Sequence, residues 1–202
     1  MDNTTLQIRA AVPQDAEALL RIYAPYVTQT AVTFEYHVPT AEEFQNRIRR
    51  VLQKYPYLVA EADGEIVGYA YAGPFRERAA YGWTAETSIY ISEGSRKTGA
   101  GGKLYRTLER VLQTQNILNL NAFVAYPREE DVHLTKNSMQ FHAHMGYELL
   151  GRFPECGYKF HRWYDMLWMG KSIGAHTALQ TPVRTFDEVR AELPRIAALE
   201  TG

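Results

Sequence analysis

Two strand-like segments joined by the pair Asp63-Gly64 constrain the fold of this chain more than any other feature of its sequence. Residues 57–62 and 65–71 are rich in Tyr, Val, Ile and Ala, and both are short enough for single strands. The pair Asp-Gly tolerates the positive φ angles of a two-residue type I′ turn, which joins neighbouring antiparallel strands. The sequence therefore predicts a β-hairpin over residues 57–71.

Further strands and amphipathic helices surround this hairpin. Apolar residues spaced three and four apart predict helices that begin at Pro13, at Thr40 and near Gly99, and Glu43 completes a capping box with Thr40. A short helix is expected over 136–145, and strands are expected at about 6–12, 84–92, 118–126, 147–153 and 158–169. This order predicts an α/β (α+β) fold, with one mixed, largely antiparallel sheet flanked by helices in a single domain.

The last 32 residues differ in character from the rest of the chain. We expect the main domain to span residues 1–170 and a C-terminal extension to span 171–202. Residues 181–183 read as a linker, and the apolar residues from Phe186 to Leu193 predict a short helix that Pro194 interrupts. The sequence leaves open whether this extension covers the domain or a partner subunit.

Composition excludes several classes of function. A net charge of −1 disfavours nucleic acid as a partner, because neutralising phosphates requires a basic excess. The single cysteine, Cys156, cannot form an internal disulfide, and residues 1–5 lack the basic start of a secretory signal. No apolar run reaches the length of a membrane span, and no cluster of residues has metal-ligand spacing. We expect a cytoplasmic protein without metal and without a membrane partner.

A basic, glycine-rich loop lies between a predicted strand and a predicted helix. Small residues let backbone N–H groups approach a ligand closely, and a helix N-terminus adds partial positive charge. A nucleoside-triphosphate loop is excluded, since Ala100-Gly101 stands where Lys and Ser/Thr are needed. The segment suits a pyrophosphate and consists of Arg96, Lys97, Thr98, Gly99, Ala100, Gly101 and Gly102.

This loop resembles the acetyl-CoA pyrophosphate motif of the GNAT acetyltransferase superfamily. The stretch from Tyr71 to Thr87 resembles the signature of the phosphinothricin acetyltransferase family within it, as do Thr33-Phe34-Glu35, Tyr55-Pro56 and the strand with Trp163 and Asp165. The resemblance covers residues 6–170. It implies a GNAT-like fold, acetyl-CoA as co-substrate and a homodimer.

The resemblance also implies residues that bind the cofactor. The backbone of Ile89, Tyr90 and Ile91 would align the pantetheine arm, beside the loop that holds the pyrophosphate. GNAT helices before the final strands usually begin with an Asn three residues before a Ser. Thr135 occupies that position here and Asn137 follows two residues later, so the sequence leaves open which of them contacts the cofactor.

Two residues match catalytic positions of the family. Glu86 would remove the proton from the attacking ammonium. At pH 7 an α-amine of pKa near 8 is about 10% neutral and a lysine side chain well below 0.1%, so a weak base serves an amino-acid substrate better. His142 would relay this proton or orient Glu86; alternatively, it is a packed histidine beside Phe141 and Met145.

The substrate pocket is implied by a further set of matches, which are Phe34, Glu35, Arg76, Arg78 and Tyr81. Two cations and a phenol suit an anionic acceptor. We expect direct acetyl transfer to the free α-amine of a small amino acid or analogue, such as phosphinothricin, methionine sulfone or methionine sulfoximine. The alternatives are a polyamine or protein N-terminal acetyltransferase, and a non-catalytic acyl-CoA-binding regulator. Cys156 has no activating cation beside it and is expected to be inert.

Overall fold

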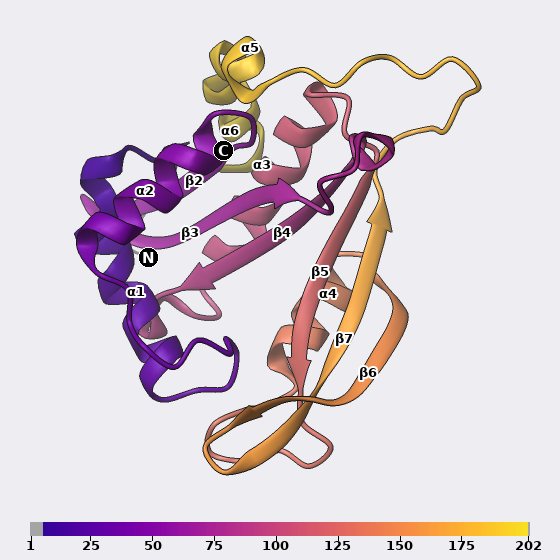
Figure 1. The fold of residues 1–202 in the computed structure, drawn as a ribbon. Coiled ribbons are helices and arrows are strands. Elements are labelled where there is room, and N and C mark those ends of the chain that lie inside the picture. The colour runs from indigo at the N-terminus through magenta and orange to yellow at the C-terminus, as the bar shows by residue number, and fades with distance from the viewer. Residues whose placement is uncertain (1–5, 202) are drawn as a thin grey trace.

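A seven-stranded sheet in the order β1-β2-β3-β4-β5-β7-β6 forms the centre of the molecule (Figure 1). The computed structural model describes residues 6–201, so the N-terminal segment 1–5 lies outside the described residues. The strands are β1 (Gln7–Ala10), β2 (Tyr57–Ala62), β3 (Glu65–Pro74), β4 (Thr84–Ile91), β5 (Asn119–Tyr126), β6 (Glu148–Lys159) and β7 (Arg162–Ser172). The helices are α1 (Ala16–Thr28), α2 (Ala41–Leu52), α3 (Ala100–Thr114), α4 (Asn137–His144), α5 (Phe186–Val189) and α6 (Leu193–Thr201).

The predicted hairpin is confirmed as β2 and β3. Asp63 and Gly64 have φ angles of 52° and 79°, and they join the pair Ala62–Glu65. Side chains alternate between the two faces of β2, because successive residues of a strand point in opposite directions. Tyr57 and Val59 therefore pack against α1 and α2, whereas Leu58 and Ala60 pack on the α3 face.

One pair of neighbouring strands is parallel, and it is short. β4 and β5 are paired only at Thr84–Asn119, Ala85–Leu120 and Glu86–Asn121, and every other pair of neighbours in the sheet is antiparallel. Beyond Glu86 the two strands diverge (Figure 1). The sheet is thus mixed and largely antiparallel, as predicted, and it opens along β4.

The hairpin of β6 and β7 turns at a different place from the one predicted. The sequence predicts separate strands at 147–153 and 158–169, with a connection over 154–157. Instead β6 continues to Lys159 with a bulge between Phe153 and Gly157, and the turn is made by Phe160-His161 with φ angles of 51° and 59°. Tertiary packing stabilises this turn, because the Phe160 ring stacks on His133 with centroids 3.9 Å apart.

The C-terminal helices complete the core on the α3 face. Residues 173–185 are irregular, and α5 and α6 then place apolar side chains in the same buried cluster as α3. Pro194 is the second residue of α6, so it begins a helix rather than interrupting one, a position where its missing N–H has no cost. The buried side chains are Phe186, Val189, Leu193, Ile196 and Ala197.

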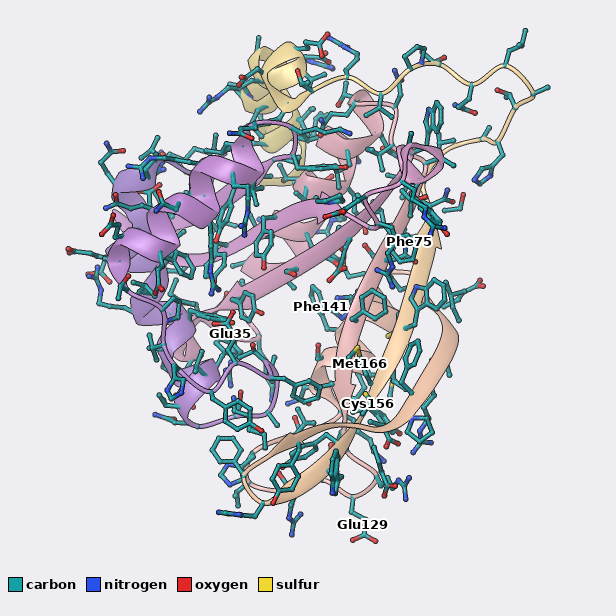
Figure 2. All side chains as sticks on the ribbon, viewed as in Figure 1. Glu35, Phe75, Glu129, Phe141, Cys156 and Met166 are labelled. Atoms are coloured by element: carbon teal, nitrogen blue, oxygen red, sulfur yellow. The ribbon has the colours of Figure 1, made fainter. Side chains whose placement is uncertain are left out.

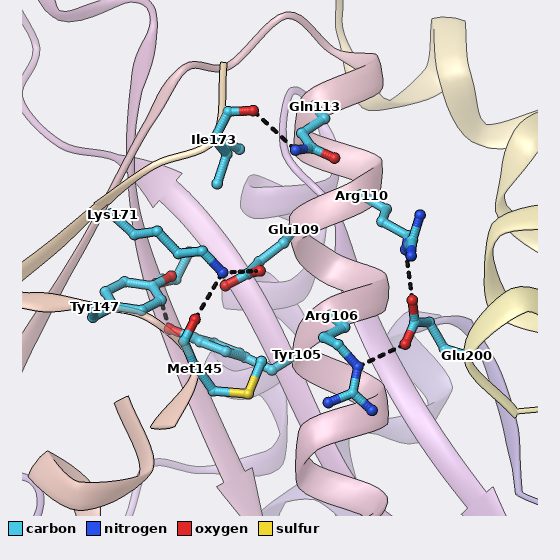
Figure 3. Close-up of polar contacts among 11 residues, drawn as sticks. Tyr105, Arg106, Glu109, Arg110, Gln113, Met145, Tyr147, Lys171, Ile173 and Glu200 are labelled. Atoms are coloured by element: carbon cyan, nitrogen blue, oxygen red, sulfur yellow. Dashed lines mark hydrogen bonds and ion pairs between the residues drawn. The ribbon is translucent and has the colours of Figure 1, made fainter. Parts of the chain in front are cut away.

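Charged residues hold α3 on two opposite sides (Figure 3). On one side Glu200 of α6 accepts hydrogen bonds from Arg106 (2.7 Å) and Arg110 (2.5 Å). On the other, Lys171 of β7 donates to Glu109 and to the carbonyl of Met145 at the end of α4, both at 2.7 Å. These contacts fix the helix whose N-terminus follows the glycine-rich loop.

Candidate active site

The opening between β4 and β5 contains two adjoining cavities. The larger, about 330 Å³, lies between β4 and the start of α4. It brings together five residues that the sequence assigned to cofactor binding, which are Ile89, Ile91, Arg96, Thr135 and Asn137. Because Thr135 and Asn137 both line it, the choice between them stays open.

The smaller cavity, about 50 Å³, continues the larger one into the sheet. Val32, Ile89 and Ser138 line both. The smaller cavity reaches Thr87 on β4 and His142 on α4. The main chain of β4 is therefore accessible from the large cavity as far as the candidate catalytic histidine.

The backbone of β4 faces this opening at alternate residues. The N–H of Ser92 donates to Val67 on β3, so the N–H of Ile91 points the other way, toward the opening. There Ile91 donates to the hydroxyl of Tyr26 (3.2 Å), and this hydroxyl donates to the Ile91 carbonyl (2.7 Å). The Tyr90 side chain lies on the opposite face, with its ring 5.0 Å from that of Tyr23. No sequence pattern pointed to Tyr26, because it lies within a predicted helix and matches no motif.

The glycine-rich loop ends at the N-terminus of α3. Gly99 has φ 89° and caps the helix, and a side chain there would strain the left-handed backbone. The first intrahelical bond is donated by Lys103 to Gly99, so the N–H groups of Gly101 and Gly102 precede it. Exposed Arg96 and Lys97 flank these groups. The arrangement can bind an anion with backbone N–H groups and positive side chains.

Glu86 and Thr87 project from opposite faces of β4. Thr87 is buried on the α3 face, where its hydroxyl lies 2.6 Å from that of Tyr105 and donates to the Asn121 carbonyl at 3.2 Å. Glu86 therefore faces the side of α1 and α2. Burial raises the pKa of Glu86, and the charge of Arg76 opposes this effect. A half-buried carboxylate of raised pKa is a stronger base than an exposed one.

His142 is buried on α4, with 5% of its surface exposed. Its Nδ1 lies 2.8 Å from the carbonyl of Ser138, which assigns the proton to this nitrogen. Burial lowers the pKa of His142, and Nε2 has no hydrogen-bond partner within residues 6–201. The ring is therefore neutral, with a free lone pair. Its hydrogen bond goes to Ser138 and not to Glu86, so the structure does not join the two candidate catalytic groups directly.

The predicted substrate residues fall into two groups. Arg76 donates to the Phe75 carbonyl (2.7 Å), its guanidinium lies 4.4 Å from the centre of the Phe75 ring, and Tyr81 contacts the same ring edge-on. Figure 2 shows Phe75 beside β5 and β7. Arg78 is exposed, and its side chain forms no hydrogen bond or ion pair with the described part of the chain.

Phe34 and Glu35 form the second group, in the loop between α1 and α2. The Phe34 ring lies so close to Gly157 on β6 that a Cβ there would clash with it. Buried Lys159 donates to the carbonyls of Thr30 and Thr33, both at 2.8 Å, and so ties the loop to β6. No sequence pattern pointed to Lys159, because lysine is almost always exposed.

The described residues contain neither a metal-binding cluster nor a membrane-spanning helix. Within residues 6–201, no group of three or more His, Cys, Asp or Glu side chains has the arrangement of a metal site. No helix in the same range is both long enough and apolar enough to cross a membrane.

The sheet that opens along a parallel strand pair, with a helix N-terminus suited to an anion beside the opening, has the architecture of the GNAT acetyltransferases. The family model for the acetyltransferase (GNAT) domain matches residues 8–168, and the chain belongs to this family. This confirms the resemblance that the sequence motifs indicated.

Particular relatives refine the family. The phosphinothricin N-acetyltransferase of Streptomyces viridochromogenes is 32% identical over 161 residues, which are 80% of this chain and 84% of the relative. The L-methionine sulfoximine/L-methionine sulfone acetyltransferase of Salmonella typhimurium is 29% identical over 174 residues, which are 86% of this chain and 98% of the relative. The crystal structure of a phosphinothricin acetyltransferase from Sinorhizobium meliloti with acetyl-CoA superposes with a TM-score of 0.78 at 29% identity, covering 90% of this chain and 98% of that one.

Proposed function

We propose that this acetyltransferase transfers the acetyl group of acetyl-CoA directly to the free α-amine of a small amino acid or analogue. Phosphinothricin, methionine sulfone and methionine sulfoximine represent the acceptor class, and the names of the relatives support it. The observation that carries the proposal is the opening beside β4, which extends from Arg96 of the glycine-rich loop along the backbone of β4 to His142.

The cofactor is held mainly by backbone groups in this proposal. The N–H groups at the start of α3 bind the pyrophosphate together with Arg96 and Lys97. The main chain of residues 89–91 aligns the pantetheine arm, and Thr135 or Asn137 contacts it from the α4 side. The common lining of the large cavity by these side chains supports the assignment.

The reaction follows from the position of Glu86. Its carboxylate accepts a proton from the acceptor ammonium, and the neutral amine attacks the thioester carbonyl. The C–N bond forms, the C–S bond breaks, and the second proton of the attacking nitrogen passes to the sulfur, so that coenzyme A leaves as a thiol. A backbone N–H of β4 stabilises the developing oxyanion. His142 is the second candidate to accept the proton, because its Nε2 has no hydrogen-bond partner within residues 6–201 and the residue lines the inner cavity.

We infer that two copies of the chain form a two-fold dimer. Large apolar side chains on β6 and β7 are exposed over a continuous hairpin, and such patches usually bind another protein surface. They include Leu149, Leu150, Phe153 and Trp163, with 44–60% exposure. A cytoplasmic location and the absence of nucleic-acid partners complete the proposal, in line with the net charge of −1.

The test combines binding with turnover. Acetyl-CoA at millimolar concentration should raise the melting temperature, and no shift would reject the cofactor assignment. Release of free thiol is then measured with methionine sulfone, methionine sulfoximine, phosphinothricin, spermidine and short peptides. We expect turnover of the amino-acid analogues. Turnover of spermidine alone, or of peptides alone, would overturn the acceptor class, and binding without turnover of any amine would indicate a regulator.

A further inference from the structure

A cavity of about 320 Å³ on the α1 and α2 side of the sheet is lined mainly by tyrosines, together with Phe44, Val51, Arg50 and the ion pair of Glu35 and Arg47. Five tyrosines from α1, β2, β3 and β4 form its walls, and Glu35 and Arg47 lie at its edge. Figure 2 shows Glu35 near the end of β4, on the side of the molecule formed by α1 and α2. The tyrosines are Tyr23, Tyr57, Tyr69, Tyr71 and Tyr90.

The walls of this cavity are rigid. The Tyr57 and Tyr71 rings stack with centroids 4.8 Å apart, and the Tyr69 and Tyr90 rings stack at 5.2 Å. Tyr23 meets Tyr90 edge-on at 5.0 Å. Tyr57 and Tyr69 are 2% and 1% exposed, so the surrounding core holds them in place. A cavity with preformed aromatic walls and few charged groups is typical of a small-molecule site.

The cavity adjoins the candidate catalytic groups. Tyr90 lines both this cavity and the inner cavity that contains His142. Tyr71 on β3 pairs with Ser88 on β4, and Glu86 projects from the same face of β4 two residues before Ser88. Glu86 therefore lies diagonally across from Tyr71, on the face that carries this cavity.

The ion pair of Glu35 and Arg47 offers a negative charge to an ammonium and a positive charge to a carboxylate, the two charged groups of a free amino acid. Glu35 and Arg47 are joined at 2.7 Å, and their side chains are 36% and 38% exposed. A free amino acid carries an ammonium and a carboxylate on adjacent carbons. It can therefore separate this pair and replace each charge with an equivalent one, so that neither Glu35 nor Arg47 loses a partner. A polyamine offers no group to Arg47, which would be left unpaired.

We propose that the acceptor amino acid binds in this tyrosine cavity, with its carboxylate on Arg47 and its ammonium between Glu35 and Glu86. The proposal rests on the acetyltransferase function given above and adds to it the site and the recognition of the α-carboxylate. The acceptor side chain packs between the tyrosine rings, where it is shielded from water. Arg47 is thus a binding residue for the acceptor carboxylate that no sequence motif indicated.

The experiment pairs one substitution with one change in the acceptor. Arg47→Met is compared with wild type on methionine sulfone and on its α-carboxamide, which lacks the negative charge. We expect the KM for methionine sulfone to rise about 10- to 100-fold, as for loss of a charged hydrogen bond, and the KM for the carboxamide to change less than about threefold. The KM for acetyl-CoA should stay constant.

The matched control is Arg49→Met on the same helix. Arg49 is exposed, and among the described residues its side chain donates to Asn46 and Gln45 of α2 alone. The KM values of Arg49→Met for both acceptors should therefore equal those of wild type. Should Arg47→Met lower the melting temperature strongly, Arg47→Lys replaces it, since Lys keeps the charge and the stem but loses the paired N–H groups. Equal effects of Arg47→Met on both acceptors, or none on either, would overturn the proposal. Wild type that acetylates neither acceptor would instead reject the underlying function.

Discussion

The two faces of β4 are built in contrasting ways. On the α3 and α4 face, the Thr87 hydroxyl, the phenols of Tyr105 and Tyr147 and the Asn121 carbonyl form a closed hydrogen-bond network. On the α1 and α2 face, Tyr90 and four other tyrosines line a cavity, and Glu86 projects from the same face of β4. The same strand thus has a face whose polar groups are paired within the protein and a face whose polar groups are available to a ligand.

In the function proposed above, this contrast lets one strand bind two substrates. The proposed cofactor site lies in the opening between β4 and β5 and uses backbone groups, which do not depend on side-chain identity. The proposed acceptor site is built from side chains, which can change without disturbing the hydrogen-bond network on the other face. We therefore expect substitutions on the cavity face to change catalysis, and substitutions on the network face to change stability.

The largest expected effect comes from Glu86→Gln on the cavity face. Glutamine keeps the shape of the side chain but cannot accept the amine proton, so turnover should fall at least about 100-fold. Thiol release at saturating substrates measures it. Glu77→Gln, at an exposed position nearby, is the control, and the melting temperature should be the same in both. Unchanged turnover would remove Glu86 from the mechanism.

Thr87→Val tests the network face. The substitution keeps the volume but leaves the Tyr105 hydroxyl and the Asn121 carbonyl without their partner, which should cost about 1–3 kcal/mol of the free energy of unfolding. Denaturant titration measures this loss. The control is Thr84→Val, whose hydroxyl accepts only a 3.5 Å contact from Asn119. If Thr87→Val lost turnover while keeping its stability, the division between the two faces would be wrong.

The smallest effect is a pH dependence that arises from His142. Its pKa is lower in the folded protein than the ordinary 6.5, because burial disfavours the charged ring. Below pH 6.5 the unfolded chain therefore binds more protons than the folded protein. As the pH is lowered from 6.5, the free energy of unfolding should fall by at most about 1.4 kcal/mol per pH unit, until the pKa of His142 in the folded state is passed. The measurement is denaturant unfolding between pH 5 and 7.5.

Two variants isolate this contribution. His142→Gln should flatten the pH dependence, whereas His144→Gln, two residues further on and exposed, should leave it intact. If both variants kept the slope of wild type, another group would be responsible for it. A stronger slope in His142→Gln would contradict the assignment of a neutral, buried ring.

Local signals in the sequence were sufficient for most of the fold. Asp63-Gly64 forms the predicted turn, and Thr40 and Glu43 form the predicted capping box with bonds of 3.2 and 2.7 Å. Each depends on residues within a few positions of one another. The turn at Phe160-His161 was not predictable in this way, because it depends on the packing of Phe160 against His133.

The candidate site also contains one part that local sequence predicted and one part that depends on tertiary contacts. The cofactor loop is one continuous segment, so its composition was enough to find it. Tyr26, Arg47 and Lys159 belong to elements distant in sequence from that loop, and they act through contacts made only when the elements pack together. Arg47 had the pattern of any surface residue on a helix. Only the assembled structure shows that it lies at a tyrosine cavity and pairs with Glu35.

The position of α5 and α6 has a consequence for biosynthesis. Phe186 and Ile196 are buried against α3, which itself packs on β2 and β3 from the first half of the chain. During translation the early strands emerge long before these residues, and apolar surface on α3 stays uncovered meanwhile. A nascent chain stalled before residue 186 should therefore bind chaperones, and release from them should follow only once α6 has left the ribosome.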